Sequence, residues 1–296
     1  MGGADVIPGV SGGTIAFITG VYEELLHSLK NIDLDAVKLL RKGEIAECWK
    51  KINGNFLLAI FAGIATSILS LAKLLTYLLE HYPIHIWSFF FGLILISSPL
   101  ILRSIKKWTI ATITAFPIGI ATAYAITVLT PAQTPEAYWF VFFAGALAIC
   151  AMILPGISGA FILLLLGKYE FIIQALFKPD FIVIILFALG CLAGLLSFSR
   201  LLSWILDRYH NITIALLAGF MLGSLNKVWP WKECLRYRIS SEGKQICAFD
   251  KSILPGTYLE KTGQDPQVFQ AILLMALGII LIVLIEKIAQ SLKTKH

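Results

Sequence analysis

Long apolar runs without charged residues constrain this chain more than any other feature of its sequence. A helix that crosses a bilayer needs about 20 mainly apolar residues, and several runs match that length or come close to it. They predict a multi-pass membrane protein built from membrane-spanning α-helices. The clearest runs cover residues 55–79, 86–102, 109–129, 181–206, 212–226 and 268–286.

The composition agrees with this prediction and excludes other classes of protein. Only 14% of the residues are charged and 58% are hydrophobic, whereas an ordinary soluble domain is about 25% charged. The chain is too apolar to be disordered, and five cysteines in 296 residues are too few for a secreted disulfide scaffold. The net charge of +6 indicates basic loops that set membrane topology rather than nucleic-acid binding.

Two further apolar stretches, residues 4–26 and 138–176, are each broken by the pattern Pro-Gly-x-Ser-Gly. Proline removes a backbone hydrogen-bond donor, and glycine permits non-helical backbone angles. At membrane depth such a break is tolerated only where protein or water satisfies the freed backbone groups. The two breaks are therefore candidates for a polar site inside the membrane.

The two broken stretches are copies of one another. The first reads PGVSGGTIAFITGVYE from Pro8 and the second reads PGISGAFILLLLGKYE from Pro155, an offset of 147 residues. A second pair of segments, 74–82 and 201–209, matches at an offset of 127 residues. Two matches in the same order indicate an internal duplication.

The duplication divides the chain into repeat one, residues 1–130, and repeat two, residues 131–296. Each repeat is expected to hold a broken hairpin followed by three helices. The expected parts, in chain order, are a hairpin at 1–26, a cytoplasmic loop at 27–53, helices within 55–129, a hairpin at 138–176, helices within 181–226, a polar loop at 227–267 and a last helix at 268–286.

The predicted fold is an all-α integral membrane protein, and the orientation of its two repeats depends on the broken stretches. If each is a re-entrant hairpin, a repeat crosses three times and the second copy is inverted, as in many transporters. If each crosses fully, the repeats are parallel with four spans. Inversion puts 13 lysines and arginines inside and nine outside, against 18 and four for the parallel arrangement, so basic-residue counting favours the parallel one. We favour inversion, because segments 138–153 and 160–167 are each too short to span.

A glycine-rich break that opens a helix exposes backbone N–H groups at the positive end of the helix dipole, which suits an anion such as phosphate. Inverted copies would face each other near the middle of the membrane. The alternative is a packing kink in which the glycines only allow close helix contact. The candidate phosphate ligands in the breaks are Ser11, Gly12, Gly13, Thr14, Ser158 and Gly159.

Lys73 and Arg200 form a symmetric pair at the offset of 127 residues. Charge within apolar sequence is costly and is a functional hypothesis by default. Both cations could neutralise a bound phosphate. The alternative is that each side chain snorkels from a helix end and pairs with the acid seven residues later, Glu80 or Asp207.

Four other charged residues are candidates for supporting roles. Asp5, Glu23 and Glu170 could couple a proton or another cation, although interfacial capping would also explain such positions. Arg103 lies in a short basic loop that marks topology or attracts anionic headgroups.

No catalytic constellation is apparent in the sequence. The chain has no Walker A loop and no HExxH motif, so we expect neither ATP hydrolysis nor metal catalysis. No cofactor is predicted beyond a possible use of the proton-motive force. Cys234 and Cys247 in the polar loop are either free thiols or, if that loop is extracytoplasmic, a disulfide.

The segment from Ala4 through Glu23 resembles the undecaprenyl phosphate (polyprenyl phosphate) translocases of the PopT type. The second break and the helix pattern also fit, so the resemblance covers nearly the whole chain. It implies flipping of undecaprenyl phosphate from the outer to the inner leaflet of the bacterial cytoplasmic membrane, which recycles the lipid carrier of cell-wall synthesis. Family members carry an apolar stretch before this motif, so the resemblance implies that the first hairpin is truncated or begins upstream of Met1.

Two other functions remain open from the sequence. Inverted broken helices serve ion-coupled or small-anion transporters equally well. A membrane phosphatase acting on a prenyl phosphate would need a nucleophile or an acid–base set near the phosphate, and no such set is apparent.

Overall fold

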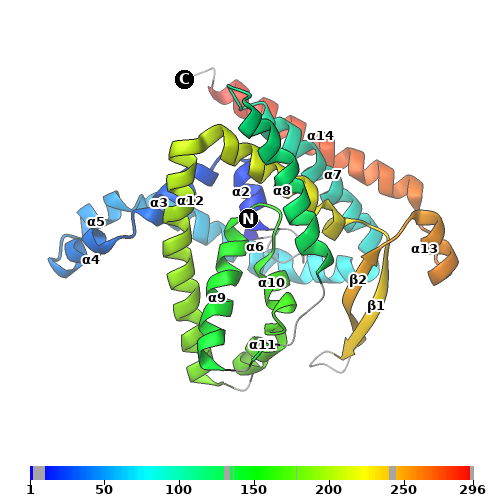
Figure 1. Cartoon of the computed structure of the whole chain (residues 1–296), viewed down its shortest axis with the longest axis horizontal. Helices are drawn as coiled ribbons and strands as arrows, with labels where there is room; N and C mark the ends of the chain where they lie inside the picture. Colours follow the sequence, from blue (N-terminus) through cyan, green and yellow to red (C-terminus); the bar gives the residue numbers. More distant parts are fainter. Residues whose placement is uncertain (3–10, 130–133, 136, 178, 240–244, 294–296) are drawn as a thin grey trace.

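The computed structural model describes residues 1–2, 11–129, 134–135, 137–177, 179–239 and 245–293 (Figure 1). Its elements, in chain order, are α2 (Gly12–Ile18), α3 (Tyr22–Lys30), α4 (Leu34–Arg41), α5 (Ile45–Lys51), α6 (Gly54–His81), α7 (Pro83–Leu102), α8 (Ile110–Val128), α9 (Tyr138–Ile153), α10 (Gly159–Leu165), α11 (Tyr169–Phe177), α12 (Phe181–Gly223), η1 (Ser224–Val228), β1 (Lys232–Ile239), β2 (Gln245–Ser252), α13 (Pro255–Thr262) and α14 (Val268–Lys293).

Five helices in the described part of the chain are long and apolar enough to cross a membrane, namely α6, α7, α8, α12 and α14. Their outer faces carry large apolar side chains such as Leu69, Ile110 and Phe269, each more than three-quarters exposed. Apolar surface of this extent is stable only against lipid or protein. The prediction of a helical, multi-pass membrane protein is thus confirmed.

Helix boundaries recur at the two offsets found in the sequence. α2 and α10 begin at Gly12 and Gly159, and α3 and α11 begin at Tyr22 and Tyr169. α6 runs from 54 to 81, and the first half of α12 runs over the equivalent positions. The helix then breaks at Tyr209, with φ −129° and ψ 43°, as the chain breaks at Tyr82, with φ −133° and ψ 51°. The predicted spans 181–206 and 212–226 therefore form one kinked helix.

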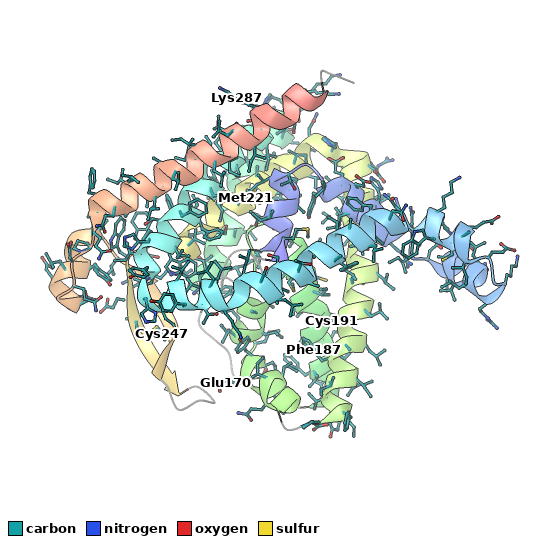
Figure 2. The ribbon with its side chains drawn as sticks, turned by 180° about the vertical axis from the view of Figure 1, so that it is seen from behind. Glu170, Phe187, Cys191, Met221, Cys247 and Lys287 are labelled. Atoms are coloured by element: carbon teal, nitrogen blue, oxygen red, sulfur yellow. A yellow bond between two sulfur atoms is a disulfide. The ribbon has the colours of Figure 1, made fainter. Side chains whose placement is uncertain are left out.

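The two repeats interlock through equivalent glycines. Gly92 of α7 lies against the backbone of Met275 in α14, and Gly219 of α12 lies against the backbone of Phe116 in α8. A helix of each repeat thus packs closely on a helix of the other, which the absence of a side chain permits. Met221 is fully buried at the centre of this bundle (Figure 2).

The predicted polar loop 227–267 is more ordered than expected. It contains an antiparallel hairpin of β1 and β2 and the short helix α13, at the opposite side of the molecule from α4 and α5 (Figure 1). Cys234 and Cys247 are joined by a disulfide across the hairpin. No strand was predicted here, because charged residues alternate with the apolar ones and the segment lacks an apolar run.

Replacing both Cys234 and Cys247 with serine is expected to lower the local stability of the hairpin by about 3 kcal/mol, since the bond closes a loop of roughly 15 residues. Hydrogen exchange of the β1 and β2 amides measures this loss. Amides of α9 and α12 are the internal control and should keep their protection. Unchanged exchange in the hairpin would contradict the prediction.

Candidate functional site

Four hydrogen bonds between described residues join the two broken segments to each other, and the longest of them runs from the hydroxyl of Ser11 to the carbonyl of Leu154 at 3.3 Å. The hydroxyl of Ser11 donates to the carbonyl of Met152 at 2.9 Å, and the hydroxyl of Tyr22 donates to the carbonyl of Ile153 at 3.1 Å. In the other direction, the N–H of Gly156 donates to Oγ1 of Thr14 at 2.8 Å. A helix leaves its last carbonyl oxygens without intrahelical partners. The hydroxyls of repeat one donate hydrogen bonds to these oxygens at the end of α9.

Glycine is needed where the two segments meet. A Cβ atom on Gly13 would lie 2.5 Å from the carbonyl oxygen of Ile153. Gly156 has a φ of +90°, a backbone conformation that side chains disfavour, and its Cβ would lie 2.7 Å from the hydroxyl of Ser224. Close approach therefore accounts for these glycines, as the packing alternative proposed.

The second break turns the chain back as a helical hairpin. Leu163 of α10 packs against Ala144 and Ala148 of α9. Gly159, the first residue of α10, lies against Ala148 and Met152 near the end of α9. α10 therefore runs back along α9.

Ser11 and Ser158 occupy equivalent positions, but their hydroxyls differ. Ser11 is 1% exposed, accepts from the N–H of Gly13 at 3.0 Å and donates to repeat two. Ser158 is 7% exposed and precedes α10, and its hydroxyl has no hydrogen-bond partner among the described residues. A buried hydroxyl without a partner is unfavourable and is available to an incoming ligand. In this conformation, Ser158 is thus a better candidate ligand than Ser11 or Thr14.

An apolar cavity of about 150 Å³ adjoins the first break. It reaches Gly12 and Gly13 of α2 and lies among α3, α6, α9 and α12. Its walls include Leu25, Leu29, Phe61, Ile64, Ile149 and Leu195.

The predicted coupling residues lie in different places. Glu23 accepts a hydrogen bond from Nε2 of His210 at 3.0 Å, just after the kink of α12. Glu170 is exposed in the first turn of α11. Asp5 lies outside the described residues.

The predicted cations are not brought to the breaks in this conformation. Arg200 is exposed on α12 and donates to the carbonyl of Ile32 at 3.0 Å. Lys73 is exposed on α6, and Arg103 is exposed just after α7. Asp207 pairs with Lys30 and His27 rather than with Arg200. In the residues described, no cluster of His, Cys, Asp or Glu is placed to hold a metal.

One buried lysine was missed from the sequence. Lys168, between α10 and α11, is 2% exposed, donates to the carbonyl of Thr134 and lies within 6 Å of the rings of Phe140 and Phe171. In the sequence, the apolar residues around Lys168 are the one indication that it is buried.

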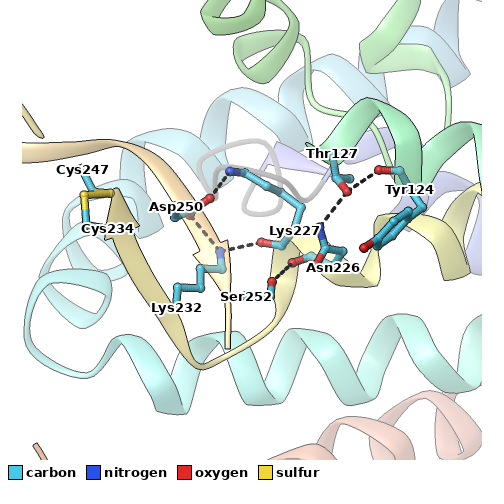
Figure 3. A network of polar contacts seen from close by, with 9 residues as sticks. All are labelled: Tyr124, Thr127, Asn226, Lys227, Lys232, Cys234, Cys247, Asp250 and Ser252. Atoms are coloured by element: carbon cyan, nitrogen blue, oxygen red, sulfur yellow. Dashed lines mark hydrogen bonds and ion pairs between the residues drawn. A yellow bond between two sulfur atoms is a disulfide. The ribbon is translucent and has the colours of Figure 1, made fainter. Parts of the chain in front are cut away.

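A second missed group joins η1 to the hairpin (Figure 3). Asp250 accepts from Nζ of Lys227 at 2.8 Å and lies 3.3 Å from Nζ of Lys232. Burial lowers the pKa of Lys232 to about 8, an effect that Asp250 partly offsets. Burial alone would raise the pKa of Asp250, but the two lysines outweigh it and the pKa is lowered. Asp250 is therefore ionised at neutral pH, and Lys232 is mostly protonated.

Comparisons with known proteins agree on one family. A family model described as undecaprenyl phosphate translocase-like matches residues 1–246. The chain is 46% identical to a polyprenyl-phosphate transporter of Vibrio cholerae, over 98% of this chain and 94% of that protein. It is 32% identical to a polyprenyl-phosphate transporter of Staphylococcus aureus, over 78% of this chain and 83% of that protein. No solved structure matches the chain.

Proposed function

The chain belongs to the undecaprenyl phosphate translocase-like family, and we propose that it moves undecaprenyl phosphate across the bacterial cytoplasmic membrane, from the outer to the inner leaflet. This step would return the lipid carrier for cell-envelope synthesis. The names of both relatives favour a transporter over an enzyme. The structural observation that carries the proposal is the direct contact of two broken segments beside an apolar cavity.

Contacts along α12 support an inverted arrangement of the repeats. Glu23 of α3 reaches His210, whereas Ile172 of α11 packs with Val183 near the start of α12. At 1.5 Å per residue these two contacts are roughly 40 Å apart along the helix, comparable to the thickness of a bilayer. Equivalent ends of the two hairpins would thus lie at opposite membrane surfaces, as inversion requires.

The hairpin disulfide indicates which side of the membrane β1 and β2 face in the proposed topology. Disulfides persist in oxidising, extracytoplasmic compartments, so we assign β1 and β2 to the outside. Glu170 and Cys247 lie toward one end of the molecule and Lys287 lies at the other (Figure 2). The basic loops 27–53 and 103–107 would then face the cytoplasm together with Lys287.

The phosphate would cross where the two breaks meet, and the prenyl chain would stay in lipid and in the apolar cavity. Ser158 and the N–H groups at Gly159 would bind the headgroup first. Ser11, Gly12, Gly13 and Thr14 would join when the hydrogen bonds between the breaks open. Alternating access of this kind needs only that the substrate favour the open arrangement.

Charged residues at the two surfaces have supporting roles in this proposal. Lys73 and Arg200 would neutralise the phosphate after rearrangement, and Arg103 would attract anionic headgroups. Glu23, Glu170 or Asp5 would couple transport to the proton-motive force.

The test is a leaflet-resolved assay in proteoliposomes that contain undecaprenyl phosphate. We expect the protein to equilibrate the lipid between leaflets at least tenfold faster than protein-free vesicles, without release of inorganic phosphate. Release of phosphate would indicate a phosphatase. Transport of small anions without movement of the lipid would indicate the other rival function, and either outcome would refute the proposal.

A further inference from the structure

The charged group that joins η1 to the hairpin is largely shielded from water. The side chains of Lys227, Lys232 and Asp250 are 19%, 13% and 27% exposed. Nζ of Lys232 also donates to the carbonyl of Lys227 at 2.7 Å, and the disulfide lies farther along the same hairpin (Figure 3). Buried charges of this kind are stable only when they are well paired.

Two ammonium groups face one carboxylate in this cluster. The nearest other acid on β1, Glu233, is paired with Lys261 of α13 at 2.6 Å. Among the described residues, the surplus positive charge meets no second carboxylate: Nζ of Lys232 contacts the carbonyl of Lys227 and lies 4.2 Å from the ring of Trp87. A cation over an aromatic ring is held less strongly than it would be by a charge-assisted hydrogen bond to a second anion.

The cluster adjoins the second break. Nζ of Lys227 lies 4.8 Å from the ring of Phe161, in the first turn of α10 and three residues after Ser158. Ser224, at the start of η1, contacts Gly156 within the break. The cluster therefore lies close to the start of α10, the helix that Ser158 precedes, and in the proposed topology this is the outer side of the break.

The geometry points to Lys227 and Lys232 as the cations that receive the phosphate monoester of a prenyl lipid from the outer leaflet, with Asp250 as the internal anion that it displaces. This inference rests on the proposed function. It replaces the exposed Lys73 and Arg200 as the first charged contacts of the substrate. Asp250 holds both lysines in place until the headgroup takes over their hydrogen bonds, so the acid competes with the substrate.

Binding of undecaprenyl phosphate to the purified full chain in nanodiscs tests this inference. Lys227→Gln is expected to weaken binding at least tenfold, and Lys227→Arg should retain most of it. Asp250→Asn is expected to strengthen binding severalfold, because it removes the competitor. Lys251→Gln changes the exposed neighbour of Asp250 and is the matched control, with binding unchanged. Undecaprenol, which lacks the phosphate, should bind equally well to the wild type and to Lys227→Gln.

The opposite effects expected for Asp250→Asn and Lys227→Gln on binding separate a role in binding from a merely structural one. If the cluster only held the hairpin in place, Asp250→Asn and Lys227→Gln would weaken binding alike. That result, or wild-type binding by Lys227→Gln, overturns the inference and leaves the proposed function intact. Failure of the wild type to bind undecaprenyl phosphate would instead count against the proposed function and against this inference with it.

Discussion

Alanine in place of Gly190 is expected to lower the free energy of unfolding by about 1–3 kcal/mol, the usual cost of overpacking a tight contact. The added Cβ would lie 2.0 Å from the carbonyl oxygen of Phe142. Because that atom belongs to the backbone of α9, it cannot rotate away, and the two helices must separate. Denaturant or thermal unfolding in detergent measures the loss.

Gly63 is the matched control, because it is the equivalent glycine of repeat one. An added Cβ at Gly63 meets no atom within 4 Å. Alanine is favoured over glycine in a helix by up to about 1 kcal/mol, so Gly63→Ala should leave stability unchanged or raise it. Equal losses at Gly63 and Gly190 would contradict the close contact of α12 with α9 at Gly190.

The sequence predicts the helical part of this fold well, because membrane spans have a strong local signal. The apolar runs locate α6, α7, α8 and α14, and the duplicated motifs agree with helix boundaries that recur at both offsets. The single kinked helix α12 was not predicted. At the kink, Tyr209 alone has non-helical backbone angles, and no proline or glycine lies at that position.

The contacts between the breaks could not be predicted, because they join residues more than 130 positions apart. The motif identifies Ser11 and Ser158 as equivalent, whereas the structure distinguishes them by what each hydroxyl contacts. Lys227, Lys232 and Asp250 were missed for a related reason. Charges in a polar loop are usually solvated, and only the fold of the hairpin reveals that these three lie together and are largely shielded from water.

Ser158→Ala is expected to reduce transport of undecaprenyl phosphate about tenfold or more while leaving stability nearly unchanged. The hydroxyl has no partner among the described residues, so its loss removes no hydrogen bond that holds the fold. A hydrogen bond to a charged group is worth about 1.5–3 kcal/mol, and a loss of 1.4 kcal/mol corresponds to a tenfold change. Flipping in proteoliposomes and the unfolding midpoint are measured on the same preparation.

Ser11→Ala, the same substitution in the other copy of the motif, should behave differently. It removes the cap of α2 and the hydrogen bond to Met152, so stability should fall by about 1–3 kcal/mol. The same loss weakens the contact that closes the path between the breaks, and it removes a ligand that joins only later, so transport by the protein that remains folded should fall less than in Ser158→Ala. If Ser158→Ala transports at the wild-type rate, the headgroup does not bind at this hydroxyl. If it instead unfolds as readily as Ser11→Ala, then Ser158 supports the fold, and the two breaks share one structural role.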